Sequence, residues 1–301
     1  MKKILALTLA LLMTFSSTFV VLAAPGGNGK GNGQTSGGDT TKIERMQQLQ
    51  EMKALRKSEQ YTRKSVDAYM RMLRKEIQML IAQINEMLEG NYDGPGTTTS
   101  GAIEIDITTG GGIDLDLYTG DTETLLALLA QLQELRKDIN LARFDARAFI
   151  RASYSPGELE YIQNILDGIY SRYSGFTALP VDSIVMEDVT FKFDVPPLIK
   201  NGRTLIPVRS IAEGLGAVVT WDGVKQEVTI VRENKVIILT IGESVAKVGT
   251  VNPGNDFVEV PFDSQAEIVM SRTILPLRFI AETFGLTVEW DAQTRTIIII
   301  E

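Results

Sequence analysis

The chain has 301 residues, of which 44% are hydrophobic and 23% charged, and its formal net charge is −8. It contains no Cys and no His. Disulfides, thiolate or imidazole metal ligands, and triads that need either residue are therefore excluded. The acidic balance does not suggest a nucleic-acid partner, because phosphate binding needs clustered Lys and Arg. The chemistry that is left uses carboxylates, Lys, Tyr and hydroxyls, or oxygen-ligated metals such as calcium.

Residues 1–23 have the pattern of a secretory signal peptide. Lys2 and Lys3 precede a mostly apolar run from Ile4 to Val20, and small residues for cleavage end at Ala23. The apolar run is short for a bilayer about 30 Å thick, so we favour a cleaved signal over a membrane anchor. We expect a mature chain without a membrane span, located outside the cytoplasm or in the cell envelope.

Residues 24–40 form a Gly-rich tract without apolar periodicity, which predicts a flexible linker. A helix is predicted over 41–90, with Thr41 and Glu44 as a capping box. The polar stretch 56–65 predicts a bend or a split. Beyond it, apolar residues alternate at spacings of four and three, which is typical of a coiled coil. This seam consists of Val66, Met70, Leu73, Ile77, Leu80, Ile84 and Met87.

A β-hairpin is predicted near 102–118, where apolar and acidic residues alternate on both sides of a glycine turn. Four carboxylates share one face of this hairpin. They are Glu104, Asp106, Asp114 and Asp116. Calcium binding is one interpretation of this face. A solvated face opposite an apolar one is the interpretation that we favour, since a single acidic hairpin lacks the tandem copies of a calcium-binding β-roll.

Helix returns over 121–175, with a second start at Ser155, Pro156 and Glu158 that has the residues of a capping box. The first part carries a matching seam of Leu125, Leu128, Leu132, Leu135, Ile139, Ala142, Ala146 and Phe149. Two or three helices with matched seams predict that 41–175 forms an elongated antiparallel helical hairpin or bundle.

Residues 181–301 contain an internal repeat at an offset of 69 residues. The copies read GRTLIPVRSIAEGLGAVVTWDGVKQEVTI (202–230) and SRTILPLRFIAETFGLTVEWDAQTRTIII (271–299), and Phe193-Asp194 upstream corresponds to Phe262-Asp263. The repeated motif comprises Arg203, Pro207, Arg209, Glu213, Gly216, Trp221 and Asp222, then Arg272, Pro276, Arg278, Glu282, Gly285, Trp290 and Asp291.

Each copy predicts a strand, a helix that begins at the proline, a left-handed glycine and a β-hairpin. One such unit cannot bury both faces alone, so we expect the two copies to share a core. The fold class is therefore α+β, with the helical region followed by a duplicated small domain of antiparallel sheet and helix.

The string NGRTLIPVRSIAEGLGAVVTWD, with its second copy, resembles the copper amine oxidase N-terminal (stalk) domain family over about 181–301. The resemblance implies an antiparallel sheet around a helix, on secreted or envelope proteins of Gram-positive-type bacteria. In the amine oxidases this domain is an accessory stalk. Copper and the tyrosine-derived quinone belong to a separate catalytic domain with three His ligands. The resemblance implies no copper here, because this chain has no His.

The motif residues allow two interpretations. Arg209 with Glu213, and the equivalent pair Arg278 with Glu282, are either ligand-binding pairs or structural ion pairs that hold the helix to the sheet. Both tryptophans either stack on sugars or pack in a core, and both aspartates cap the following turn. We favour structural roles for all of these residues, including Arg203 and Arg272.

The segment 56–75 holds seven basic and two acidic residues. It either docks on anionic wall polymers or forms a solvated helix face paired with acids on its neighbour, and we favour the second interpretation.

Taken together, the patterns predict a non-catalytic secreted or cell-envelope protein without a cofactor or metal. In it, the stalk-like domain is an adaptor for a wall glycan or a partner protein. One alternative is an extracytoplasmic coiled-coil scaffold or chaperone-like clamp that self-associates through its helices. A more remote alternative is a carboxylate-dependent glycan hydrolase.

Overall fold

The computed structural model describes residues 37–91, 117–251 and 257–301, and residues 46–301 form one compact unit. The predicted signal peptide, most of the linker and nearly all of the predicted acidic hairpin lie outside the described residues. The α+β class is confirmed, because helices come first and antiparallel sheets dominate the C-terminal region.

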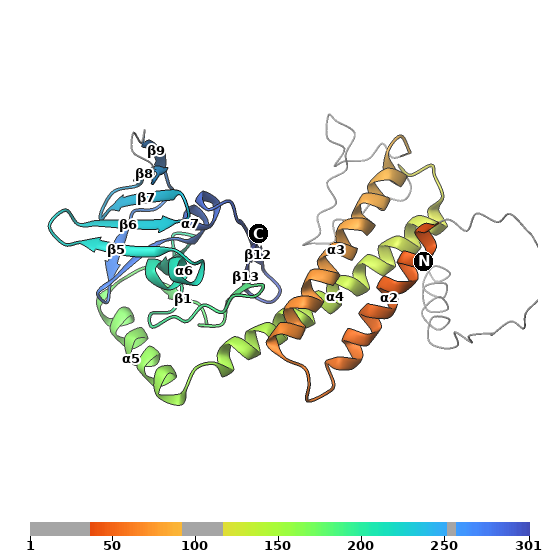
Figure 1. The fold of residues 1–301 in the computed structure, drawn as a ribbon, viewed down its shortest axis with the longest axis horizontal. Coiled ribbons are helices and arrows are strands. Elements are labelled where there is room, and N and C mark those ends of the chain that lie inside the picture. The colour runs from red at the N-terminus through yellow and green to blue at the C-terminus, as the bar shows by residue number, and fades with distance from the viewer. Residues whose placement is uncertain (1–36, 92–116, 252–256) are drawn as a thin grey trace, which may run out of the picture. The chain divides into compact units, whose positions relative to one another are not determined.

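Within the described ranges, four helices precede strand β1 (Figure 1). They are α2 (Gly37–Leu55), α3 (Arg63–Leu88), α4 (Thr122–Ala152) and α5 (Pro156–Arg172). Helix α2 begins at Gly37, so Thr41 lies inside the helix and the predicted capping box at this position is wrong. The chain does split within the polar stretch 56–65. Thr62 caps α3 there, and its Oγ1 accepts a hydrogen bond from the Ser65 amide at 3.3 Å.

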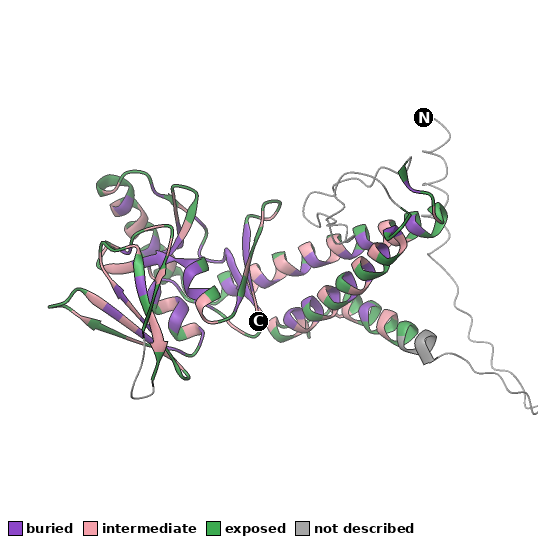
Figure 2. Cartoon of the chain, turned by 90° about the horizontal axis from the view of Figure 1, so that it is seen from above, coloured by how far each residue is buried: buried purple, intermediate pink, exposed green. Residues whose placement is uncertain are grey.

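Helices α3 and α4 pack antiparallel along their apolar seams. The Arg63 guanidinium donates to the Ala146 carbonyl at 3.1 Å near one end. At the other end, the Thr119 amide donates to the Asn91 carbonyl at 2.9 Å. Figure 2 shows the buried residues along these helices. The buried seam consists of Val66, Met70, Leu73, Ile77, Leu80, Ile84 and Leu88 on α3, and Leu125, Leu132, Leu135, Ile139, Ala142, Ala146 and Ile150 on α4.

The seams differ from the sequence prediction near their ends, where Leu88 and Ile150 are buried in place of Met87 and Phe149, and where the predicted Leu128 is only partly buried. Each fully buried Leu or Ile contributes about 1.5–3 kcal/mol relative to exposure. The heptad pattern is therefore satisfied by contacts within the chain.

The predicted capping box at the start of α5 is confirmed. The Glu158 amide donates to Ser155 Oγ at 3.2 Å, and the Ser155 amide donates to Glu158 Oε2 at 2.7 Å. The hydrogen bond from the Ser155 backbone, helped by the side chain of Lys192, lowers the pKa of Glu158 from 4.5 to about 2.

The lowered pKa of Glu158 gives a pH-dependent prediction. Its stabilising contribution is fully present above the unfolded-state pKa and is lost as the pH falls through the folded-state pKa of about 2. The stability difference between the wild type and Glu158→Gln should therefore shrink between about pH 4.5 and pH 2. Urea unfolding across this pH range measures the difference, and a constant difference would contradict the assignment.

Thirteen strands and two short helices make up the remainder of the described chain. The strands are β1 (Thr177–Ala178), β2 (Ile184–Met186), β3 (Leu198–Lys200), β4 (Arg203–Pro207), β5 (Val218–Asp222), β6 (Glu227–Arg232), β7 (Lys235–Thr240), β8 (Val245–Thr250), β9 (Val258–Pro261), β10 (Glu267–Val269), β11 (Arg272–Pro276), β12 (Thr287–Asp291) and β13 (Thr296–Ile300). The helices are α6 (Val208–Gly214) and α7 (Leu277–Thr283).

The two motif copies form equivalent elements that meet at a local two-fold relation. Strands β4 and β11 pair antiparallel, with Ile206 directly opposite its own equivalent, Leu275. Strands β3 and β10, which are also equivalent, flank this pair in the sheet order β1-β3-β4-β11-β10. One sheet therefore joins the two copies at its centre.

The outer sheets break the symmetry. Copy one continues from β5 and β6 into a five-stranded antiparallel sheet, β5-β6-β7-β8-β9. Copy two forms only the hairpin β12-β13, and β2 from upstream pairs with β13 in parallel. The predicted sheet is thus antiparallel except at this pairing. Strand β2 also contacts α4, so it connects the sheet to the helices.

Both short helices pack into one apolar core. Val208, Ile211 and Ala212 from α6 are buried in the same cluster as Leu277 and Ile280 from α7. This single cluster bears out the expectation of a core shared by the copies.

Candidate functional site

The tryptophans of the motif lie on edge strands and remain accessible. Trp221 lies on β5 and Trp290 on β12, and each is 42% exposed. Their cross-strand partners, Val228 and Ile297, are buried. An edge strand has a neighbouring strand on one flank only, so the other flank of its large side chains is left uncovered by the sheet. The expectation that these rings pack in a core is therefore wrong.

The aspartate after each tryptophan caps the next turn, as predicted. Asp222 Oδ1 accepts from the Val224 and Lys225 amides at 3.0 and 3.1 Å. These backbone hydrogen bonds, that of Lys225 first, lower the pKa of Asp222. Each turn is thus held in a defined conformation directly beside an exposed indole.

Asp291 makes the same turn in copy two. Its Oδ1 accepts from the Gln293 and Thr294 amides at 2.9 and 3.1 Å. Burial opposes ionisation of Asp291, but hydrogen bonds from Thr294 and the charge of Arg143 outweigh it and lower the pKa.

The second aspartate also joins the sheet to α4. Asp291 Oδ2 accepts from Arg143 Nη1 at 3.0 Å, whereas the only ion pair that the described residues give Asp222 is with Lys225, at 3.9 Å. The Gln293 side chain in the same turn accepts from Asn140 at 2.9 Å. The turn after Trp290 is therefore bonded to α4 through Asp291 and Gln293.

The helix pairs of the motif do not hold the helices to the sheet. Arg209 lies 3.7 Å from Glu213, and Arg278 lies 3.6 Å from Glu282, each within one helix. All four side chains are largely exposed. Such surface pairs contribute little to stability. The predicted tie between helix and sheet is wrong for these residues.

The first arginine of each copy instead pairs with the aspartate upstream of the other copy. Arg203 pairs with Asp263, and Arg272 Nε donates to Asp194 Oδ2 at 2.7 Å. These two aspartates are themselves equivalent in the repeat. The exchange follows from the two-fold pairing of β4 with β11, and no local sequence pattern indicates it.

The prolines and glycines of the motif shape the backbone. Pro207 and Pro276 are the N-cap residues of α6 and α7. Gly216 and Gly285 follow the helices with φ of +76° and +82°, a region that disfavours residues with a Cβ.

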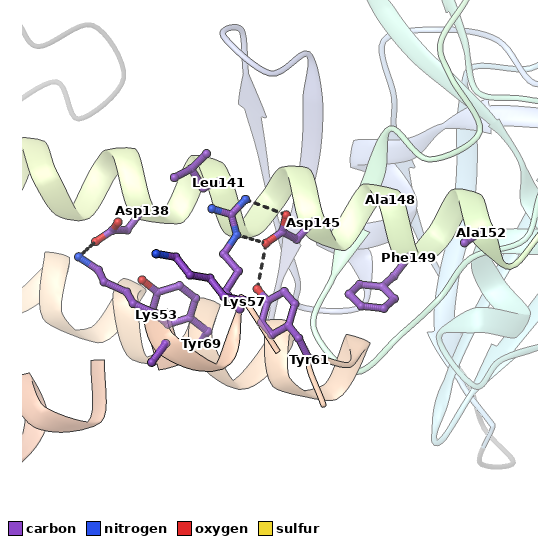
Figure 3. Close-up of a pocket in the computed structure, with 12 residues that line it drawn as sticks. Lys53, Lys57, Tyr61, Tyr69, Asp138, Leu141, Asp145, Ala148, Phe149 and Ala152 are labelled. Carbon is purple, nitrogen blue, oxygen red and sulfur yellow. Dashed lines mark hydrogen bonds and ion pairs between the residues drawn. The ribbon is translucent and has the colours of Figure 1, made fainter. Parts of the chain in front are cut away.

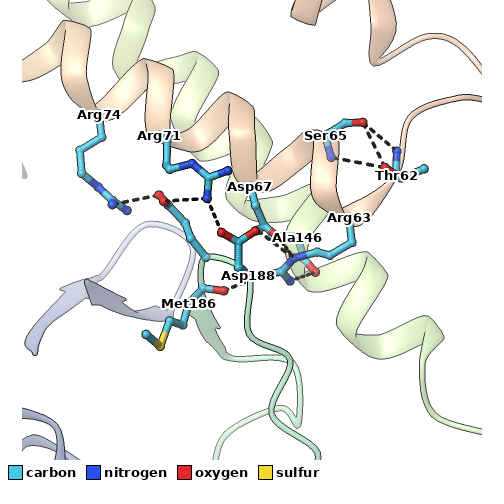
Figure 4. Close-up of polar contacts among 10 residues, drawn as sticks. Thr62, Arg63, Ser65, Asp67, Arg71, Arg74, Ala146, Met186 and Asp188 are labelled. Carbon is cyan, nitrogen blue, oxygen red and sulfur yellow. Dashed lines mark hydrogen bonds and ion pairs between the residues drawn. The ribbon is translucent and has the colours of Figure 1, made fainter. Parts of the chain in front are cut away.

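The basic segment 56–75 is largely used within the molecule (Figure 4). The Arg63 guanidinium donates to the Met186 carbonyl at 2.7 Å and contacts Asp67 at 2.9 Å. Arg71 and Arg74 pair with the acids that follow β2, with Arg71 Nη1 2.5 Å from Asp188 Oδ2. The interpretation that this segment pairs with acids is borne out. Apart from Asp67 on α3 itself, the paired acids lie on the segment after β2 and on α4, where Asp145 pairs with Arg56.

In the part of the chain that the structure describes, no cluster of acidic residues could hold a metal ion. No helix of the described ranges is long and apolar enough to span a membrane. The predicted calcium ligands of the acidic hairpin lie outside these ranges.

The paired strand–helix–hairpin units define the C-terminal domain as a small α+β module. Residues 185–299 match the family model of the copper amine oxidase N-terminal domain, which confirms the resemblance inferred from the motif. The match covers less than half of the chain and concerns the non-catalytic N-terminal domain, not the catalytic domain of the amine oxidases. No curated protein shows significant similarity to the chain.

Proposed function

We propose that this chain is a non-catalytic, secreted or cell-envelope binding protein whose C-terminal domain binds a cell-wall glycan through Trp221 and Trp290. The observation that carries the proposal is the exposure of both rings, 42% each, at equivalent positions on edge strands. An indole face covers the apolar face of a sugar, and its N–H is available for a hydrogen bond. The signal-like N-terminus supports delivery outside the cytoplasm.

The turn after Trp221 carries exposed polar groups of the kind that a sugar needs, whereas Asp291 and Gln293 in the turn after Trp290 are bonded to α4. In copy one, Asp222 and Lys225, whose side chains are 44% and 67% exposed, put a carboxylate and an ammonium in the turn that follows the tryptophan. Binding sites for small polar ligands combine such an aromatic wall with a few fixed polar groups. Two equivalent exposed indoles on one domain suit a polymer of repeated units, because contact at the first raises the effective concentration at the second.

The helical scaffold is the weaker candidate, since the apolar seams of α3 and α4 are buried against each other within the chain. Self-association would need a different surface. The hydrolase alternative finds no support in the matched domain, which is an accessory domain of the oxidases.

Co-sedimentation of the full chain with purified wall sacculi tests the glycan proposal. Trp221→Ala and Trp290→Ala should each weaken binding by about tenfold or more, as exposed aromatic hot spots do, and the double variant should weaken it further. Phe144→Ala is the control, because it removes another exposed aromatic ring, 65% exposed on α4. Equal sedimentation of all variants, or no sedimentation of the wild type, would reject the proposal.

A further inference from the structure

The helical region contains a pocket that the C-terminal domain does not share. A cavity of about 950 Å³ lies among α2, α3 and α4 (Figure 3). Its wall includes Lys53, Lys57, Tyr69, Leu141 and Phe149. This volume lies in the range of small-molecule sites, about 300–1,000 Å³.

One wall of the pocket carries a buried hydroxyl without a partner. Tyr69 is only 2% exposed, and its hydroxyl makes no hydrogen bond within the described residues. Burial, together with the charge of Asp138, raises the pKa of Tyr69, so the group is a protonated donor at neutral pH. A buried donor left without an acceptor costs about 1–3 kcal/mol. An acceptor atom on a ligand in the pocket would remove this cost.

The carboxylates of the pocket already have their counterparts. Asp145 accepts from Arg56 Nε at 2.6 Å and from the Tyr61 hydroxyl at 3.0 Å. Asp138 lies 2.5 Å from Lys53. Neither carboxylate is therefore available to a ligand cation.

One basic side chain of the pocket has no acidic partner among the described residues. Lys57 lines the pocket, and the described residues give it no ion pair. With two paired acids and three basic side chains, the pocket has a positive balance. This charge favours a ligand with one negative group.

The remaining wall is apolar. Leu141 and Phe149 line the pocket from α4, and Figure 3 labels them with the lysines and Tyr69. We propose that this pocket binds a small amphipathic anion, with an acidic head near Lys57 and Tyr69 and an aromatic or alkyl body against Leu141 and Phe149. The site is independent of the tryptophan surfaces.

Fluorescence titration of the full chain with anilinonaphthalene sulfonate tests this proposal. The probe carries one anionic head on an aromatic body. We expect saturable binding at one site per chain. Lys57→Gln and Tyr69→Phe should each raise Kd by about tenfold, the effect of losing a hydrogen bond to a charged group.

Two controls distinguish binding at this site from nonspecific binding of the probe. Lys64→Gln removes another exposed charge, on α3 outside the pocket, and should leave Kd unchanged. Neutral N-phenyl-1-naphthylamine has the same rings without the sulfonate, so its Kd should not respond to Lys57→Gln.

Tyr69→Phe is a conservative change that removes no hydrogen bond among the described residues, so its fold should persist, as thermal unfolding will check. Anion binding that is absent, or equally strong in all variants, would overturn the proposal. The proposal would also be overturned if Lys57→Gln weakened binding of the neutral probe as much as binding of the anionic probe.

Discussion

Replacing Arg147 by Ala is expected to lower the free energy of unfolding by about 3 kcal/mol. Arg147 joins α4 to the sheet, with its Nε 2.9 Å from Asp182 Oδ2. Its Nη1 also donates to the Thr294 carbonyl at 2.6 Å. The Arg147 side chain is 17% exposed and that of Asp182 is 9% exposed. Removal of the guanidinium would take the short hydrogen bonds from the buried Asp182 carboxylate and from the Thr294 carbonyl, which is the costly way to break a buried pair.

A matched control for Arg147 lies one helical turn further along α4. Arg151 reaches the same aspartate at 3.8 Å, but its side chain is 58% exposed. Arg151→Ala should therefore cost less than about 1 kcal/mol. Urea unfolding followed by circular dichroism measures both variants. If Arg147→Ala cost no more than Arg151→Ala, the joint between helix and sheet would not depend on this buried pair.

Truncation of the central cross-strand pair should have an effect of similar size. Ile206 and Leu275 are both 0% exposed and lie opposite each other where the two copies meet. Ile206→Ala and Leu275→Ala should each lower stability by about 2–5 kcal/mol, through lost burial and the cavity that remains. The double variant should depart from additivity, because the two side chains belong to one packed site.

The shared core also predicts the form of the transition. The C-terminal domain should unfold in one cooperative transition, because α6 and α7 pack in one cluster. Either truncation should lower the midpoint of that single transition. Val218→Ala is the control. Its side chain is 64% exposed on β5, so the change should be within about 0.5 kcal/mol. Two separate transitions, with only one lowered by the mutation, would show that the copies fold independently.

Much of the local structure could be predicted because its causes are local. The seams of α3 and α4 follow from apolar residues spaced at three and four, which place side chains on one helix face. The capping box at Ser155 needs only residues three apart. The left-handed backbone after each short helix could be predicted from the glycine at that position, because glycine adopts positive φ without a steric cost.

The helix boundary at Gly37 was missed for a local reason as well. Gly and Asn are poor helix formers, so the composition of 24–40 favours a linker. The last residues of that stretch nevertheless belong to α2. Intrinsic propensity is a weak preference, and it does not set the residue at which a helix begins.

The sequence by itself determined the order of elements, the helical seams, the caps and the duplicated unit, since each depends on residues near one another in the chain. Only the tertiary structure decided the partners of the charged groups and the exposure of the tryptophans. Arg272 pairs with Asp194 because β4 and β11 meet at a two-fold relation. Trp221 is accessible because β5 ends its sheet. Both outcomes depend on which strands become neighbours, and residue spacing along the chain carries no such information.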